Sequence, residues 1–186
     1  MTPHVCPPWI GALMANPLRK LLESPRKILG PHVREGMTVL EPGSAMGFFT
    51  LPLAELVGTH GRVVAVDLQP RMLEGLAKRA RKAGLRERIE IRKCEADSLG
   101  VQDLDGSVDL AACIHVVHEI PDRAGFFAEI ARALKPGGRV LVIEPKGHVK
   151  APDFEQELAT ARAQGLEVEA TAVDLGSRRA ELTRPA

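Results

Sequence analysis

The class of fold follows from one stretch, Thr38-Val39-Leu40-Glu41-Pro42-Gly43-Ser44-Ala45-Met46-Gly47. A short run rich in β-branched residues ends in an acid, passes through a loop of small residues, and is expected to enter a helix at Gly47. Gly43 and Gly47 permit positive φ and a close approach of the backbone to a ligand. In an open α/β sheet, ligands bind beyond the carboxyl ends of the strands, and this loop follows such an end. We therefore expect the loop to hold a cofactor.

Outward from this loop, short β-branched runs alternate with stretches of helical spacing. This alternation predicts βαβ units in a mostly parallel sheet. The expected strands are Thr38–Glu41, Arg62–Asp67, Ile89–Cys94, Val108–Ile114 and Val140–Glu144. The expected helices are Pro70–Ala83, residues 122–134 with Asp122 as N-cap, and Asp153–Gln164. The tail 166–185 is expected to form an antiparallel hairpin that closes the sheet edge.

The first 35 residues differ from the rest, because they are rich in proline and carry the single tryptophan, Trp9. Ser24-Pro25 is typical of an N-cap followed by the first helical residue. We expect residues 1–35 to form an arm with short helices that covers the site. Residues 36–186 are expected to carry the ligand site, in one domain overall.

Composition argues against several classes of protein. The chain of 186 residues has a formal net charge of +1, so it lacks the basic excess of a dedicated nucleic-acid binder. No run of 18 apolar residues predicts a membrane-spanning helix, and the first residues do not have the pattern of a signal peptide. The three cysteines form no disulfide framework, which favours a reducing compartment, so we expect a cytoplasmic protein.

The later strands also end in polar residues. Asp67 ends the second strand, where an acid can accept both hydroxyls of a ribose. Asp97 follows the third strand, and two histidines follow the fourth. Phe48 stands where a dinucleotide-binding fingerprint needs its third glycine, so that match is poor. Glu41 before the loop suits a cation, such as a sulfonium with an α-amino group, better than a pyrophosphate.

Taken in order, these residues resemble the motifs of class I S-adenosylmethionine-dependent methyltransferases, over roughly residues 25–146. The family's first motif is Asp/Glu-x-Gly-x-Gly-x-Gly, which residues 41–47 match except at Ala45. Two later segments are similar to family segments, His118-Glu119-Ile120-Pro121-Asp122 and Leu134-Lys135-Pro136-Gly137-Gly138-Arg139. The resemblance implies a Rossmann-like α/β fold. Its sheet would have seven strands, six parallel and one antiparallel at the edge, with helices on both faces.

The resemblance also implies S-adenosyl-L-methionine as cofactor and S-adenosyl-L-homocysteine as product, with residues 36–186 as the methyltransferase domain. The cofactor-binding set is Glu41, Gly43, Ser44, Ala45, Gly47, Asp67, Leu68, Asp97, Ser98 and His115. Within it, Glu41 is expected at the methionine end and Asp67 at the ribose, with Leu68 beside the adenine. Asp97 is expected at the adenine amino group, unless it belongs to an ordinary surface turn.

His115 and His118 are the candidate catalytic residues, expected where the acceptor meets the methyl group. Either could act as a general base that takes a proton from an O or N nucleophile. One alternative is that His118 and Glu119 only shape the loop. Another is a metal site that includes His4 and Cys6, but the spacing lacks a metal-binding motif, and we expect no metal.

The expected activity is transfer of a methyl group to an O, N, S or C nucleophile. A small-molecule acceptor is the first choice, with no nucleic-acid or membrane partner, and the oligomeric state is not predicted. Three alternatives remain: a cofactor-binding module without catalysis, a methyltransferase of RNA or another macromolecule, and an NAD-dependent enzyme. The RNA alternative depends on a basic cluster that otherwise reads as a solvated helix face: Lys78, Arg79, Arg81, Lys82, Arg86, Arg88, Arg92 and Lys93.

Overall fold

The computed structural model describes residues 24–174 and 176–186, and their contacts divide them into two compact units. The first unit ends at Cys94 and the second runs from Glu95 to Ala186. Seven strands form a sheet in the order β3-β2-β1-β4-β5-β7-β6. Strand β7 is antiparallel to both of its neighbours, and β6 lies outside it. This order confirms the expected Rossmann-like class, with a mostly parallel sheet and one reversed strand.

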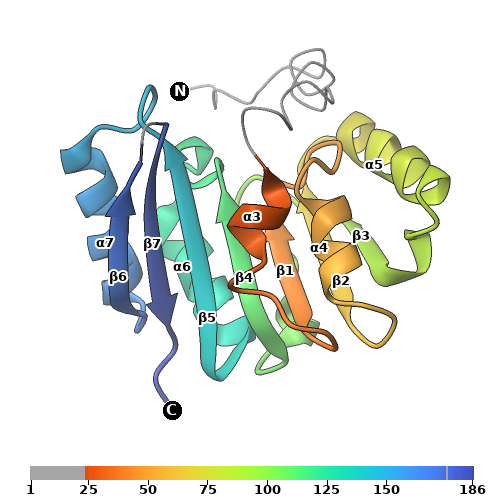
Figure 1. The fold of residues 1–186 in the computed structure, drawn as a ribbon. Helices are drawn as coiled ribbons and strands as arrows, with labels where there is room; N and C mark the ends of the chain where they lie inside the picture. Colours follow the sequence, from red (N-terminus) through yellow and green to blue (C-terminus); the bar gives the residue numbers. More distant parts are fainter. Residues whose placement is uncertain (1–23, 175) are drawn as a thin grey trace. The chain divides into compact units, whose positions relative to one another are not determined.

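The first unit contains three parallel strands, the helices between them, and α3 ahead of the first strand (Figure 1). Its strands are β1 (Thr38–Pro42), β2 (Arg62–Asp67) and β3 (Ile89–Lys93). Its helices are α3 (Pro25–Leu29), α4 (Thr50–Leu56), α5 (Pro70–Lys82) and the 3-10 turn η1 (Arg86–Arg88). The side chains from Val63 to Val66 have no exposed surface, as expected of a central parallel strand. This buried strand carries Asp67 at its carboxyl end.

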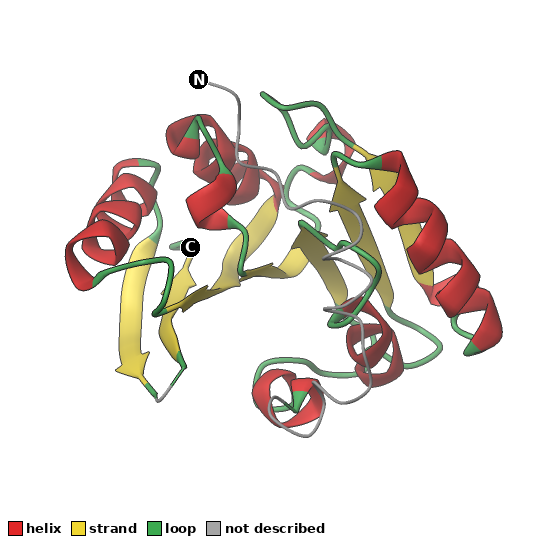
Figure 2. Cartoon of the chain, turned by 90° about the horizontal axis from the view of Figure 1, so that it is seen from above, coloured by secondary structure: helices red, strands yellow, loops and turns green. Residues whose placement is uncertain are grey.

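The second unit contains the remaining four strands, with α6 and α7 packed against each other (Figure 2). Its strands are β4 (Val108–Ile114), β5 (Leu134–Pro145), β6 (Glu167–Val173) and β7 (Ser177–Thr183). Its helices are α6 (Arg123–Ala133) and α7 (Ala151–Ala163), with the 3-10 turns η2 (Gln102–Leu104) and η3 (Val117–Glu119). Because β4 and β5 are parallel, their carboxyl ends meet at one edge, where η3 follows β4.

Most predicted boundaries agree with the structure to within one or two residues, but β5 begins six residues earlier than expected. Its register jumps from Val108 paired with Leu134 to Leu110 paired with Arg139, so the intervening residues bulge out of the ladder. The amide of Gly137 donates to the carbonyl of Arg184 at 2.8 Å, and the Arg184 amide donates to Gly138 at 2.8 Å. Pairing with the C-terminal tail therefore keeps this glycine-rich segment in the sheet.

The helix starts show which capping signals were read correctly. Helix α3 begins at Pro25 after Ser24, and Asp122 caps α6 by accepting a hydrogen bond from the Gly125 amide at 3.0 Å. Helix α4 begins at Thr50 rather than at Gly47, because residues before it form turns. Helix α7 begins at Ala151, ahead of the expected Asp153.

The tail forms the predicted hairpin, closed by an acidic side chain. The Asp174 carboxylate accepts hydrogen bonds from the amides of Gly176 at 3.0 Å and Ser177 at 2.7 Å. No helix within the described ranges is long and apolar enough to cross a bilayer. Residues 1–23 lie outside the described residues, so the covering arm, with His4, Cys6 and Trp9, stays a prediction.

Candidate functional site

The loop between β1 and α4 is a chain of turns with three residues at positive φ. These residues are Gly43 at 70°, Ala45 at 45° and Gly47 at 82°. Gly47 has a second requirement, since a Cβ there would lie 2.5 Å from Cδ1 of Leu76. The loop therefore depends on small residues for its conformation and for its packing on α5.

Asp67 at the end of β2 holds this loop through its carboxylate. Oδ2 accepts a hydrogen bond from the Ala45 amide at 2.8 Å, and Oδ1 accepts one from the Gln69 amide at 2.8 Å. Burial raises the pKa of Asp67, while these two hydrogen bonds act in the opposite direction. A carboxylate offers about four lone-pair sites, so two hydroxyls could still be accepted. The structure thus brings Asp67 together with the predicted loop.

Glu41 lies at the end of β1 and is 4% exposed. Burial raises its pKa to about 8, the nearby Thr50 hydroxyl lowers it, and the charge of Asp67 raises it. Glu41 Oε2, Ser44 Oγ and Thr50 Oγ1 have no hydrogen-bond partner among the described residues. Buried oxygens without partners on β1, the loop and the start of α4 suit a ligand that brings hydrogen-bond donors or positive charge.

Arg79 is a residue of this site that the sequence analysis assigned only to the basic cluster. From α5, its guanidinium donates to the carbonyl of Met46 at 2.6 Å, and burial lowers its pKa. Other members of the cluster are engaged in similar ways, since Arg86 and Arg88 donate to the carbonyls of Ile89 and Ala54. These contacts favour a structural role for much of the cluster.

Two of the predicted adenine residues, Asp97 and Ser98, belong to the second unit. Asp97 is exposed in a turn that the Glu95–Ser98 bridge closes, and the Ser98 hydroxyl accepts a hydrogen bond from the Gly100 amide at 3.1 Å. This geometry is that of a surface turn, which the sequence analysis kept as an alternative. Leu68, which follows Asp67 in the first unit, is half-buried. The adenine roles of Leu68, Asp97 and Ser98 stay predictions.

The two candidate histidines follow β4. His115 has a φ of 56°, unusual for a residue other than glycine, and its amide donates to the Ile143 carbonyl at 2.7 Å. Such strained residues cluster at functional sites. His118 is hydrogen-bonded through Nδ1 to Oε2 of Glu144, whose other oxygen accepts from the Val117 amide at 2.8 Å. Glu144 has no sequence signal of its own, because in the sequence it is only the last residue of an expected buried strand.

A second buried acid, Glu157 of α7, lies in the same unit. Its carboxylate oxygens make no hydrogen bond among the described residues, and the Arg123 guanidinium lies 3.8 Å away. Burial raises the pKa of Glu157 to about 7, the charge of Glu144 adds to this, and Arg123 and His118 oppose it.

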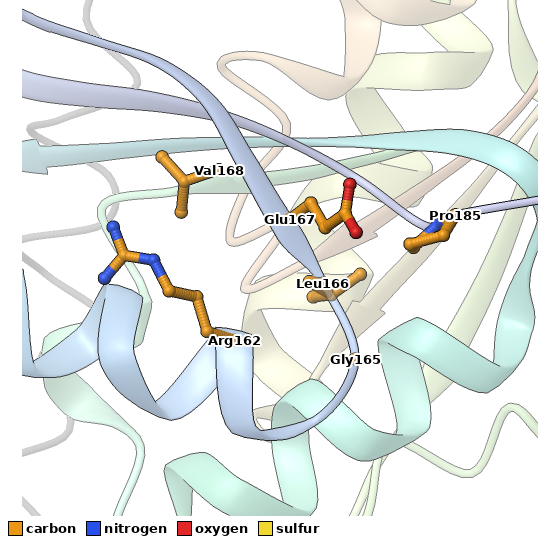
Figure 3. Close-up of a pocket in the computed structure, with 6 residues that line it drawn as sticks. All are labelled: Arg162, Gly165, Leu166, Glu167, Val168 and Pro185. Carbon is orange, nitrogen blue, oxygen red and sulfur yellow. The ribbon is translucent and has the colours of Figure 1, made fainter.

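The two described cysteines differ in burial. Cys113 is fully buried, and this burial together with the charge of Glu144 raises its pKa, whereas Cys94 is half-buried. Across the part of the chain that the structure covers, no group of three or more His, Cys, Asp or Glu side chains could hold a metal ion. A hollow at the end of α7 contains no predicted site residue; it is lined by Arg162, Gly165, Leu166, Glu167, Val168 and Pro185 (Figure 3).

The chain is similar in sequence to known methyltransferases. A family model described as a methyltransferase domain matches residues 33–178. Among curated proteins, the chain is 34% identical over 121 residues to a demethylmenaquinone methyltransferase of Lactococcus lactis, covering 65% of this chain and 46% of that protein. It is also 34% identical over 121 residues to an arsenite methyltransferase of Halobacterium salinarum, covering 65% and 30%. The chain thus spans less than half the length of these two curated relatives.

Solved structures resemble the fold more completely. A SAM-dependent methyltransferase from Aquifex aeolicus superposes with a TM-score of 0.85 at 26% identity, covering 97% of this chain and all of that one. The [4+2]-cyclase SpnF superposes with a TM-score of 0.75 at 18% identity, covering 86% and 79%. This second likeness is one of fold alone.

Proposed function

Because the chain belongs to the methyltransferase-domain family, we propose that it is an S-adenosylmethionine-dependent methyltransferase. It moves the methyl group from the sulfonium to an O, N, S or C nucleophile, and the acceptor is a small molecule. The observation that carries the proposal is the bonding of Asp67 to the Ala45 amide, which joins the family's ribose-binding acid to its glycine-rich loop. Two relatives described as methyltransferases of demethylmenaquinone and arsenite support a small acceptor.

The residues of the first unit fit the cofactor. The unpaired oxygens of Glu41 and Ser44 can accept hydrogen bonds from its α-amino group, and Asp67 retains lone pairs for its ribose hydroxyls. When bound, the cofactor supplies an electrophilic methyl group, and the protein supplies position and electrostatics. Asp97 with Ser98 at the adenine, and His115 near the methyl group, complete the proposed set.

We further propose that the protein is cytoplasmic, with residues 36–186 as the methyltransferase domain and residues 1–35 as an arm over the site. The engagement of Arg79, Arg86 and Arg88 with carbonyl groups supports a small-molecule acceptor over RNA. Salt-sensitive RNA binding at low ionic strength is the result that would favour the RNA alternative.

The test is calorimetric titration with S-adenosylmethionine and S-adenosylhomocysteine, with NAD as the control ligand. We expect micromolar binding of the two adenosyl ligands and none of NAD. Binding of neither adenosyl ligand would overturn the proposal. Binding without turnover of any acceptor would instead favour a cofactor-binding module without catalysis.

A further inference from the structure

A carboxylate and an imidazole are hydrogen-bonded to each other at the carboxyl ends of β4 and β5. Glu144 of β5 is fully buried, and its two oxygens bond to His118 Nδ1 and to the Val117 amide. Both bonds go to the 3-10 turn η3, so the acid fixes the position of the turn and of the ring. Ligands of parallel α/β sheets bind at this end of the strands.

The bonding of Nδ1 decides which ring nitrogen of His118 can exchange a proton. Nε2 has no hydrogen-bond partner within residues 24–174 and 176–186, and the side chain is 20% exposed. The ring therefore lies between a buried acid and accessible space. A histidine held at Nδ1 by a carboxylate and free at Nε2 is the arrangement of an oriented general base.

We propose that Glu144 is the positioning residue that holds His118 as the general base of the acceptor site. The acceptor class that follows is a small molecule whose nucleophile is a hydroxyl or an amine. This inference rests on the proposed methyl transfer. A thiol needs the base less, because its ordinary pKa of about 8.5 already gives some thiolate at neutral pH.

For an acceptor X–H, His118 Nε2 takes the proton, and the electron pair of X forms the new bond to the methyl carbon. The carbon–sulfur bond breaks with its pair on sulfur, which becomes a neutral thioether. Glu144 keeps its hydrogen bond to Nδ1 throughout, so the imidazolium that forms is stabilised by a neighbouring acid.

The charges around His118 support this role. Burial lowers the pKa of His118. The hydrogen bond and charge of Glu144, with the charges of Glu119 and Glu157, raise it by more, so the net shift is upward. The His148 ring lies 5.6 Å from the His118 ring, and Arg123 donates to the Val117 carbonyl at 3.2 Å. An upward shift moves the pKa of His118 from its ordinary value toward the working pH, as suits a general base.

The first arm of the test is an NMR titration of the imidazoles in the wild type, Glu144→Gln and Glu119→Gln, with His118→Gln assigning the signal. We expect the His118 pKa to lie above 6.5 in the wild type and to fall by about one pH unit or more in Glu144→Gln. Glu119→Gln is the matched control, because it removes a facing charge and leaves the bond to Nδ1; its shift should be smaller.

The second arm measures methyl transfer from S-adenosylmethionine to a catechol, a primary alkylamine and a thiol. We expect the catechol or the amine to be methylated, with a loss of about 100-fold or more in His118→Gln. In Glu144→Gln, the acidic limb of the rate should move to lower pH, since the base titrates lower. His118→Gln changes a partly exposed side chain, so this arm stands even if Glu144→Gln does not fold.

The outcomes separate this inference from the proposed function. An unmoved His118 pKa in Glu144→Gln overturns the inference, as does turnover of the thiol alone or an unchanged rate in His118→Gln. Calorimetric binding of S-adenosylhomocysteine without turnover of any acceptor also overturns it, leaving the pair a structural one. No binding by the wild type overturns the proposed function itself, whereas the titration still reports whether Glu144 controls His118.

Discussion

At the scale of single residues, Asp67 joins a strand end to the loop that follows another strand. Replacing it with Asn keeps the shape but removes the charge and one acceptor for the amides of Ala45 and Gln69. We expect the dissociation constant of S-adenosylhomocysteine to rise at least tenfold, about 1.4 kcal/mol, in calorimetry. Asp174→Asn is the matched control, because Asp174 also accepts hydrogen bonds from two backbone amides but closes the C-terminal hairpin. Equal losses of affinity in both variants would contradict a specific role.

Ala45 is the departure from the family's glycine pattern, and it adopts a φ of 45°. A left-handed conformation costs an L-residue roughly 1–2 kcal/mol, and glycine gives back part of this as backbone entropy. We expect Ala45→Gly to raise the free energy of unfolding by about 0.5–1 kcal/mol in urea denaturation. Ala172→Gly, in exposed β6, should lower it. A loss of stability in Ala45→Gly would show that the methyl group is needed where it is.

At the scale of elements, the bulge at the start of β5 depends on Gly138. A Cβ there would lie 2.8 Å from the Lys135 carbonyl oxygen and 3.0 Å from that of Val108, and backbone atoms cannot easily move. We expect Gly138→Ala to cost about 1–3 kcal/mol in thermal or urea denaturation. Gly147→Ala has open space around it and should change stability by less than about 0.5 kcal/mol. Similar losses of stability in Gly138→Ala and Gly147→Ala would contradict the steric explanation, because only Gly138 has atoms where its Cβ would lie.

The elements also show what the sequence could and could not predict. β-branched runs located β2 and β4 to the residue, because buried parallel strands are apolar along their whole length. The start of β5 was missed, since its pairing depends on Arg184, about fifty positions away in the chain. Helix α4 was placed three residues early because Gly47 belongs to a turn. Local signals such as Asp122 were read correctly, because a cap acts within one helical turn.

The candidate site divides in the same way. Asp67 and the glycine-rich loop follow a motif at fixed spacing, so the sequence could identify them. Glu144, Arg79 and Thr50 have no motif of their own, and only the folded chain brings them to His118, Met46 and Glu41 respectively. Such residues are visible only through three-dimensional contacts.

At the scale of the whole molecule, two buried acids link stability to pH. The pKa of Glu157 is about 7 and that of Glu41 about 8, against 4.5 for each in an unfolded chain. Both bind their protons more tightly when folded, so their contribution to stability is complete below about pH 4.5 and is lost as pH rises through 7 and 8. The pKa of Asp174 is lowered, so its contribution to stability is lost only in acid and does not change over this range.

We therefore expect the melting temperature to fall between pH 5 and pH 8.5. Glu157→Gln, which cannot ionise, should flatten the part of this decline near pH 7. Glu155→Gln, on the exposed side of α7, should leave the decline unchanged. A melting temperature that rises over this range would contradict the raised pKa values of Glu41 and Glu157.

Because Glu41 is buried and holds a proton, binding of a cationic ligand should release protons into the solution. An acid that holds its proton to about pH 8 gives that proton up when a cation arrives beside it, because the cation stabilises the ionised form. Loading the protein at neutral pH would then acidify an unbuffered solution by up to one equivalent. The heat of binding would differ between phosphate and Tris, because these buffers take up a proton with different enthalpies. That difference would give the number of protons that Glu41 releases.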